Sequence, residues 1–378
     1  DVYIESVYSY NSYGDNVQIS GTSGAIGDNI TIDRLRCRKA GRKCLVFESA
    51  NNIKIGNARL DNREGGSATW SGSNCLDIEP FSTADPCRYD IDYLETWGGN
   101  DFTAGTTREN GVNFSLNVGH YVQHGGELLS YSMSVNIGRA VFYDADISLM
   151  YAPYVSIGYA SFVGMTKQSL KASNSANGYP YVSISTMEII GANVEDPIDA
   201  AALYLSSGIL NIGILSVTNY YGPIASTRSV GSFPAELSIR EAMIKDSGSK
   251  HGDEYNALFL NSIYGSSAVG SVRIGSLSYW ETREAAKTPV KIFQSSDEKL
   301  VRNSSIGKVT ISGGTITSVV RSRYGNFTPT FGGGQTSVRP ELPYIGQQYF
   351  DTKLKKPVWY NGSKWIDAAG NDADAVTA

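Results

Sequence analysis

The chain has 378 residues, including 40 glycines and 24 tyrosines, and 18% of its residues are charged, with a formal net charge of -5. This composition is typical of an extracellular-type β protein and argues against a helical enzyme. Lysine and arginine are scattered, which gives no sign of a nucleic-acid surface but leaves room for a local basic groove that binds acidic sugars. The sequence has neither an apolar run long enough for a transmembrane helix nor a signal-peptide pattern at its start.

Short alternating apolar phrases predict β-strands from the first residues onward. The start, "DVYIESVYSY", already has the pattern of a strand, so we expect an N-terminally truncated chain. One phrase, two apolar residues separated by a polar or small one, recurs at intervals from 20 residues (137 to 157) to 46 residues (91 to 137). Such brief period-2 alternation indicates short strands with one buried face. The central isoleucines are Ile4, Ile32, Ile55, Ile91, Ile137, Ile157, Ile184, Ile212, Ile239, Ile274 and Ile311.

A second alternating phrase falls between the first ones. Its apolar pairs are Val17/Ile19, Leu45/Phe47, Leu76/Ile78, Val112/Phe114, Leu203/Leu205, Leu258/Leu260 and Val290/Ile292. Two or three short strands per interval, without helical periodicity, predict a solenoid whose stacked coils bury what one coil cannot bury alone. The parallel β-helix fits best, because the LxxLxL pattern of leucine-rich repeats is absent and the intervals are too irregular for propeller blades. We expect the two longest intervals, 55 to 91 and 91 to 137, to contain projecting loops.

The sequence changes character near its end. The stretch "YGNFTPTFGGGQTSVRPELP" is rich in glycine and proline, as a linker is. We therefore predict a β-helix over residues 1–325, a linker over 326–342, and a small C-terminal module with a frayed tail over 343–378.

The cysteines and histidines predict no metal site. Four cysteines are too few for a disulfide scaffold and lack CxxC spacing, so we expect reduced structural thiols. His120 and His124 are four residues apart in a non-helical context, which favours surface or turn histidines over metal ligands. We expect no cofactor. The cysteines are Cys37, Cys44, Cys75 and Cys87.

The predicted strands indicate which of the carboxylate side chains face solvent. If the apolar residues face inward, the residues between them face solvent. The first phrase then exposes Glu5, Asp33, Gly56 and Asp92 in successive coils. The second exposes Gln18/Ser20, Val46/Glu48, Asp77/Glu79 and Asn113/Ser115. Since adjacent strands lie about 4.8 Å apart, we expect Glu48 beside Glu79, with Asp77 on the same outer face.

Paired carboxylates on one face suit glycoside hydrolysis, which needs a protonated acid near an ionised partner. The catalytic candidates are Asp77, Glu79, Glu48 and Asp92. The candidates for substrate binding are Trp97, Asp101, Glu95, Trp70 and Tyr93. Solvation of an exposed face is the simpler interpretation of any single one of these residues. Two further acidic stretches, around Glu195 and around Asp253, are typical of polar turns.

Two other functions remain open at this point. A polysaccharide lyase needs a tyrosine or basic proton abstractor beside a group that neutralises a carboxylate, for which Arg88, Tyr89 and Tyr93 are candidates. A non-enzymatic adhesin needs only aromatic and polar side chains that hold a glycan.

The closing stretch "IGQQYFDTKLKKPVWYNGSKWIDAAG" resembles a short module of the type YFDTxLxKPxWxNGxxWxDAxG, which recurs at the C-terminal ends of phage tail spikes and fibres. Its tryptophans are expected to fill a miniature core or a trimer contact. The matching residues are Tyr349, Phe350, Asp351, Thr352, Leu354, Lys356, Pro357, Trp359, Asn361, Gly362, Trp365, Asp367 and Gly370.

With this module, the pattern of the whole chain resembles the phage tailspikes, which are receptor-binding depolymerases. The resemblance implies an all-β, right-handed, single-stranded parallel β-helix of the pectate-lyase type that assembles as a homotrimer. It further implies a virion tail protein, folded in the host cytoplasm and attached to the tail or baseplate through a missing N-terminal part. The expected partner is a bacterial surface polysaccharide, with no nucleic acid and no membrane insertion.

Overall fold

The computed structural model describes residues 1–20, 27–48, 50–64, 74–78, 87–98, 100–104, 114–131, 133–150, 154–173, 180–192, 201–230, 235–248, 257–264, 270–280, 282, 291–295, 305–312, 348–351 and 353–373. These residues contain no α-helix. A helix long and apolar enough to cross a membrane is accordingly not found among them.

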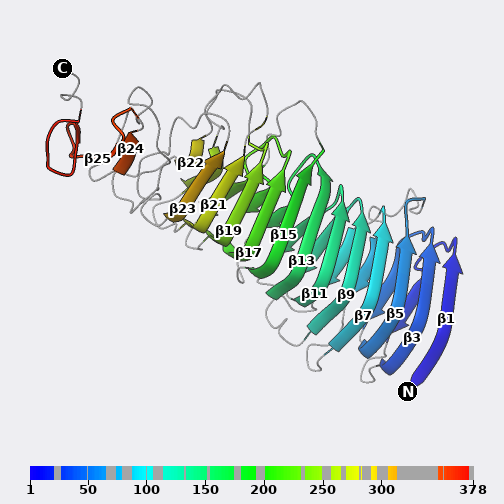
Figure 1. The fold of residues 1–378 in the computed structure, drawn as a ribbon. Coiled ribbons are helices and arrows are strands. Elements are labelled where there is room, and N and C mark those ends of the chain that lie inside the picture. The colour runs from blue at the N-terminus through cyan, green and yellow to red at the C-terminus, as the bar shows by residue number, and fades with distance from the viewer. Residues whose placement is uncertain are drawn as a thin grey trace.

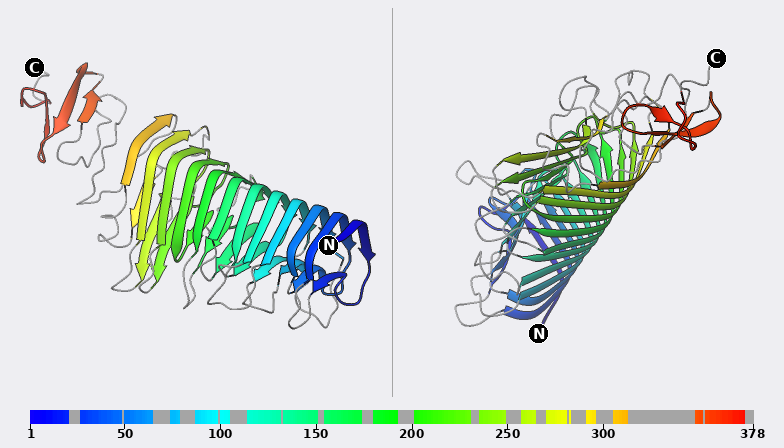
Figure 2. Two further views of the ribbon diagram at one scale, coloured as in Figure 1. Left: turned by 90° about the horizontal axis from the view of Figure 1, so that it is seen from below. Right: turned by 90° about the vertical axis from the view of Figure 1, so that its left-hand side faces the viewer.

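Two long parallel sheets wind around a shared core (Figures 1 and 2). Strands alternate between the sheets along the chain, so each coil supplies one strand to each. Sheet A consists of β1 (Val2–Tyr10), β3 (Gly27–Arg38), β5 (Ala50–Asp61), β7 (Cys87–Trp97), β9 (Phe114–His124), β11 (Ser134–Tyr143), β13 (Tyr154–Met165), β15 (Tyr181–Gly191), β17 (Gly208–Thr218), β19 (Ala235–Lys245), β21 (Gly270–Trp280) and β23 (Ser305–Ser312). Sheet B consists of β2 (Val17–Ser20), β4 (Lys43–Glu48), β6 (Asn74–Ile78), β8 (Asn100–Ala104), β10 (Glu127–Tyr131), β12 (Asp146–Met150), β14 (Leu170–Ala172), β16 (Leu203–Leu205), β18 (Ala225–Val230), β20 (Ala257–Tyr264) and β22 (Lys291–Ser295).

The predicted isoleucine ladder is confirmed along most of sheet A. Ten of the eleven predicted isoleucines, Ile4 to Ile274, align between neighbouring strands. We call these aligned positions, one per coil, the rungs of the ladder. Each apolar side chain stacks on the one from the previous coil, which gives the β-helix-like solenoid its continuous core. The all-β, parallel, coiled architecture predicted from the sequence is therefore present.

Three details of the predicted coil are wrong. The interval 91 to 137 holds a further complete coil, because Val118 on β9 aligns with both Ile91 and Ile137. The last rung is Ile306, which aligns with Ile274, whereas Ile311 lies farther along β23 and aligns with Tyr279. Phe114 of the predicted pair Val112/Phe114 belongs to sheet A, where it aligns with Cys87, whereas Val112 lies outside the described residues.

The core lies between the two sheets and forms one continuous apolar cluster. Phe47 of sheet B stacks on Tyr89 of sheet A with ring centroids 4.8 Å apart. Phe142 and Phe162, in register on neighbouring strands, stack at 4.6 Å. Because the sheets share this core, outward side chains of sheet A and outward side chains of sheet B lie on different faces of the solenoid.

Alternation breaks at the same register position in the strands of sheet A from β1 to β21, where two successive side chains face outward. On β15, for example, Ser185 and Thr186 lie between the buried Ile184 and Met187. We call the first of these outward positions the bend column. Its members are Glu5, Asp33, Gly56, Asp92, Gly119, Gly138, Gly158, Ser185, Gly213, Arg240, Gly275 and Gly307.

Glycine dominates the bend column because the coils approach each other closely there. A Cβ on Gly138 would lie 2.7 Å from the carbonyl oxygen of Gly119 in the preceding coil. The prediction that Glu5, Asp33 and Asp92 share an outward column is confirmed, since all three are exposed. Gly56 belongs to the same column but is half-buried.

The four cysteines are free thiols, and all four are buried in the coil. Contacts with the thiols of Cys37 and Cys75, together with burial, raise the pKa of Cys44. Their structural role agrees with the sequence interpretation, because such thiols stay neutral and fill space like small apolar side chains.

The C-terminal module is a three-stranded antiparallel sheet of β24 (Gln348–Asp351), β25 (Lys356–Tyr360) and β26 (Trp365–Ile366). Trp365 fills its small core with Tyr349, Val358 and Ala373, whereas Trp359 is half-buried. The predicted linker, 326–342, lies outside the described residues.

Turn-forming side chains explain the polar positions of the C-terminal motif. Asp351 Oδ1 accepts hydrogen bonds from the backbone N–H groups of Lys353 and Leu354, each at 2.9 Å. Asn361 Oδ1 accepts from Ser363 and Lys364, and Gly362 has a positive φ of 103°. The motif therefore encodes the turns of this unit.

Candidate functional site

A groove follows the bend column over the N-terminal coils of sheet A, and we call it the N-terminal furrow. It has a volume of about 780 Å³ and extends from β3 to β13. The rung residues Ile55, Ile91 and Ile137 form part of its lining. Gly119 and Gly138 also line it, and because they have no side chain they leave the groove open. The charged and amide side chains that line it are Asp33, Lys54, Arg88, Asp90, Asp92, Asn117 and Asn136.

One wall of the N-terminal furrow is a hydrogen-bonded ladder of polar side chains. Arg88 Nε pairs with Asp90 Oδ2 at 2.8 Å. Asn117 Nδ2 donates to Asp90 Oδ1 at 2.8 Å, and Asn136 Nδ2 donates to Asn117 Oδ1 at 3.0 Å. Because β7, β9 and β11 stack in register, this ladder runs along the solenoid axis and offers donors and acceptors to an extended polar ligand.

Asp92 stands in the bend column itself. Its neighbours in the column are Gly56 in the coil before and Gly119 in the coil after, so no neighbouring side chain in the column covers it. Among the described residues, no hydrogen bond or ion pair holds its carboxylate. Asp92 is therefore exposed and free to meet a ligand in the furrow.

Glu95, on the same strand and face as Asp92, is held by three side chains. Tyr93 OH donates to Glu95 Oε2 at 3.0 Å. His124 Nε2 lies 3.2 Å from Oε1, and Arg59 Nε lies 3.6 Å from Oε2. The Glu95 side chain is 14% exposed. These contacts hold the Glu95 carboxylate in a fixed orientation on the face that carries Asp92.

Tyr93 is bound to this cluster on several sides. Its ring lies under the Arg59 guanidinium, 5.8 Å from ring centroid to Cζ, and meets His120 edge-on at 5.4 Å. Burial and the hydrogen bond to Glu95 raise the pKa of Tyr93. The phenol is therefore a donor that orients Glu95 and a poor proton abstractor.

Trp97 belongs to a stack that runs along the outer face of sheet A. Its ring lies 5.1 Å from His124, which lies 4.9 Å from Tyr143 on the next coil. The Arg63 guanidinium, from the preceding coil, lies 5.9 Å from the Trp97 ring centroid. Neighbours from both adjacent coils thus contact Trp97. A sugar would therefore meet the edge of the Trp97 ring or displace Arg63. The sequence interpretation did not foresee these contacts.

The expectation that Asp77 lies on the outer face is wrong. Asp77 is 1% exposed, and its Oδ2 pairs with Lys43 Nζ of the neighbouring strand β4. Val46, its register partner, is also fully buried. Both faces of this part of sheet B are covered, so the alternation of apolar and polar residues does not show which side chains face solvent there.

The predicted acidic cluster is divided between the two sheets. Glu48 ends β4 of sheet B, where Gln18 Nε2 hydrogen-bonds its carboxylate. Asp92 and Glu95 lie on β7 of sheet A, on another face. Asp101 lies on β8, where it aligns with Leu128, and its side chain is outside the described part, as are Glu79 and Trp70.

Sequence reasoning missed the partners of Glu95. The sequence interpretation of His124 was a surface or turn histidine, and Arg59 was not among the candidates. Both lie in coils adjacent to Glu95: Arg59 aligns with Glu95, and His124 aligns with Trp97. The alignment of Ile55 with Ile91 reveals Arg59, and the alignment of Ile91 with Val118 reveals His124 once β9 is recognised as a coil.

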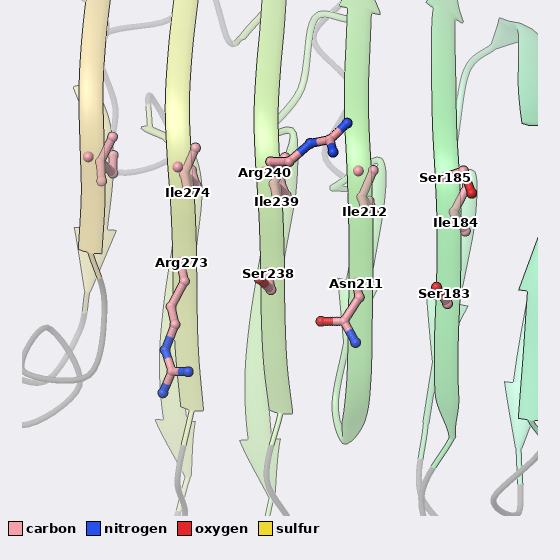
Figure 3. A pocket seen from close by; sticks show the side chains of 14 residues that line it. Ser183, Ile184, Ser185, Asn211, Ile212, Ser238, Ile239, Arg240, Arg273 and Ile274 are labelled. Atoms are coloured by element: carbon pink, nitrogen blue, oxygen red, sulfur yellow. The ribbon is translucent and has the colours of Figure 1, made fainter.

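A second groove continues the bend column over the C-terminal coils, and we call it the C-terminal furrow (Figure 3). It has a volume of about 790 Å³ and extends from β15 to β23. The two furrows abut, because Ser156 of the first aligns with Ser183 of the second.

Within the described ranges, no group of three or more histidine, cysteine, aspartate or glutamate side chains is placed to hold a metal ion. Comparisons of the chain with protein-family models, with curated proteins and with solved structures found no match.

Proposed function

We propose that this chain is the glycan-binding and glycan-cleaving part of a phage tailspike that hydrolyses a bacterial surface polysaccharide. The observation that supports this best is the exposed Asp92 in an elongated furrow, on the same strand and face as the preorganised Glu95. The two-sheet solenoid and the C-terminal motif from Tyr349 to Gly370 agree with the resemblance to tailspikes.

The finer architecture belongs to the same proposal. We assign the solenoid as a right-handed, pectate-lyase-like parallel β-helix, because crossover connections between parallel strands are almost always right-handed. Like the proteins it resembles, it would assemble as a homotrimer and be carried on the virion tail by a further N-terminal part. Sedimentation should then give the mass of three chains, and a monomer would contradict this assembly.

The chemistry follows from the different surroundings of the two carboxyl groups. Glu95 is held in place by Tyr93, His124 and Arg59, so it is assigned as the base that activates water. Asp92 lies open in the furrow, where it can reach a bound glycan, so it is assigned as the acid that protonates the glycosidic oxygen. Cα atoms three residues apart on a strand are about 10 Å apart, which argues against the roughly 5 Å carboxyl pair of a retaining enzyme, so we propose the inverting mechanism, whose carboxyl groups lie about 6.5–9.5 Å apart.

A lyase reaction with a tyrosine base finds less support. Tyr89 lies in the core stacked on Phe47, where burial raises its pKa. Tyr93 also has a raised pKa and donates to Glu95. Arg88 is occupied by Asp90. A non-enzymatic adhesin is the stronger rival, because the Asp90–Asn117–Asn136 ladder holds a glycan without any need for cleavage.

The test is incubation of the protein with capsular and O-antigen polysaccharides from a panel of bacteria. Size-exclusion chromatography follows polymer length, a reducing-end assay detects hydrolysis, and ultraviolet absorbance detects the unsaturated ends that a lyase makes. We expect shorter polymers with new reducing ends and no unsaturation. A polysaccharide that is bound but keeps its length identifies an adhesin and rejects both enzymes.

Substitutions then locate the site. Asp92→Asn and Glu95→Gln should each lower the cleavage rate about 100- to 10,000-fold, the range of general acid–base catalysis. Glu188→Gln is the matched control, because Glu188 also faces outward and accepts a hydrogen bond from a tyrosine, Tyr159, at 2.8 Å, but lies outside the N-terminal furrow. Normal cleavage by both site variants would reject this assignment.

A further inference from the structure

The described lining of the C-terminal furrow carries positive charge and no negative charge. Arg240 and Arg273 are exposed and line it, together with serines and Asn211. No aspartate or glutamate is among its described lining residues. Figure 3 shows the Arg240 side chain extending toward the strand that carries Ile212, while Arg273 extends away from the bend.

Both arginines are available to a ligand. Among the described residues, neither guanidinium has an ion pair or a side-chain hydrogen bond. The nearest acids along the same strands are Glu236 and Glu241 on β19, which lie outside the furrow lining. A surface arginine pair without carboxylate partners is positioned to bind an anion from outside, because guanidinium groups bind planar carboxylates through two parallel hydrogen bonds.

The two furrows differ in charge but share one track. Arg240 occupies the bend column, as Asp92 does, six coils farther along sheet A. At about 4.8 Å per coil, the two residues are about 29 Å apart along the axis. A chain-like ligand that lies in the bend column at Asp92 therefore passes Arg240 without changing direction.

Asn211 and Tyr181 form a polar edge beside the arginines. Asn211 Nδ2 donates to Tyr181 OH at 3.3 Å, and Tyr181 stacks on Tyr154 with ring centroids 5.4 Å apart. Tyr154 and Tyr181 remain 49% and 39% exposed. These groups offer hydroxyl and amide contacts that suit sugar hydroxyls, which points to a charged sugar as the ligand and not to a free ion.

We propose that the C-terminal furrow binds the carboxylates of an acidic polysaccharide, one that contains uronic or other carboxylated sugars, while the same polymer chain crosses Asp92 in the N-terminal furrow. This inference rests on the proposed function for the catalytic role of Asp92. Binding of the polymer by the arginines, however, can be measured without cleavage. The Arg240 and Arg273 guanidinium groups fix the position of the polymer along the axis.

The experiment measures binding of full-length chain carrying Asp92→Asn, so that the probes stay intact. The probes are oligomers of polygalacturonate, alginate, hyaluronan and polysialic acid, each beside its carboxyl-reduced neutral form. Titration calorimetry is carried out at low and at high salt. We expect at least one acidic oligomer to bind, its neutral form to bind at least tenfold more weakly, and binding to weaken as salt increases.

Variants assign the binding to the arginines. Arg240→Gln and Arg273→Gln should each raise Kd about tenfold, as expected for the loss of one charge-assisted contact. Lys245→Gln, which removes the same charge from an exposed position on β19 outside the furrow, should leave Kd unchanged. Failure of every acidic oligomer to bind, equal binding of a neutral form, or unchanged Kd in both arginine variants overturns the proposal.

Two further readouts separate the possible failures. If arginine-dependent binding is found but no polymer is cleaved by the wild-type chain, the glycosidase proposal fails and the acidic-glycan site stands. If the arginine variants change the sedimenting mass and leave glycan binding unchanged, the arginines contact another subunit, and the binding proposal is rejected.

Discussion

Lys43 and Asp77 form an ion pair that water scarcely reaches, with side chains 11% and 1% exposed. Removing two charges from water is costly, and a buried pair recovers that cost only while both partners are present. Asp77 is therefore assigned to stability, in contrast to Asp92, whose carboxylate faces the furrow.

Asp77→Ala should lower the free energy of unfolding by about 3–5 kcal/mol, because it leaves the Lys43 charge buried without this carboxylate. The double variant Lys43→Met with Asp77→Leu should recover most of the loss. Urea denaturation followed by circular dichroism measures both. Asp92→Asn, at an exposed position, serves as the control with unchanged stability. An Asp77→Ala variant as stable as the wild type would show that the pair contributes nothing.

At the scale of the strand, the bend column depends on the absence of side chains. Gly138→Ala should destabilise the solenoid, because the new Cβ would lie 2.7 Å from a backbone oxygen that cannot move independently of its coil. Gly14→Ala is the matched control, since a Cβ at Gly14 meets nothing within 4 Å.

The expected result is a lower thermal midpoint for Gly138→Ala and an unchanged midpoint for Gly14→Ala, both measured by circular dichroism. Equal midpoints for the two variants would mean that neighbouring coils separate easily at the bend, contrary to the close approach described above.

The C-terminal module supplies a test that depends on pH. Hydrogen bonds from the backbone of Asn371 and Ala369, together with Lys356, lower the pKa of Asp367. A carboxyl group whose folded pKa is lowered stabilises the fold above its unfolded pKa of about 3.9. That contribution is lost as the pH falls through the folded pKa.

Fluorine NMR of 5-fluorotryptophan-labelled protein reports on Trp365, whose signal is assigned by Trp365→Phe. The native Trp365 signal should persist at neutral pH and diminish below about pH 4. In Asp367→Asn the module should be weaker at neutral pH and lose most of this acid dependence. Asp372→Asn, which removes a more exposed carboxylate, is the control. An unchanged acid transition in Asp367→Asn would contradict the role of Asp367.

How far the sequence predicts these strands depends on how many faces are buried. Alternation located the rungs from Ile4 to Ile274 because one face of sheet A meets solvent. It failed at Asp77 because β6 is covered on both faces. It also missed Val118, because the recurring pattern was one of central isoleucines and a valine fills that position equally well.

The candidate site was predictable only in part for the same reason. The exposure of Asp92 follows from its own strand. The contact of His124 with Glu95 depends instead on which coil stacks on which, and that register is decided by packing over the whole core.

For the whole molecule, when residues 1–378 are expressed alone, the first coil has a neighbouring coil on one side of it within the described chain. In the described chain β1 pairs only with β3, and β2 pairs only with β4. Tyr3, Tyr8 and Tyr13 are 66%, 72% and 79% exposed. In a stacked repeat, a terminal unit has one stabilising interface and an internal unit has two.

Hydrogen exchange followed by mass spectrometry should therefore find faster amide exchange in β1 than in β13 or β15. Peptides from β7 should resemble those of β13, since both are internal. Equal protection of β1 and β13 would show that something other than a neighbouring coil supports the first strand.

The bend column has a consequence for how such a chain diversifies. Because each coil contributes one position to the column, the spacing of Asp92 and Arg240 is a whole number of coil steps. Duplication or loss of a coil between β7 and β19 would change that spacing by about 4.8 Å while leaving the surroundings of each side chain intact. Under the proposed function, a change in the number of coils would alter which positions of a bound polysaccharide meet Asp92 and Arg240, without redesigning either furrow.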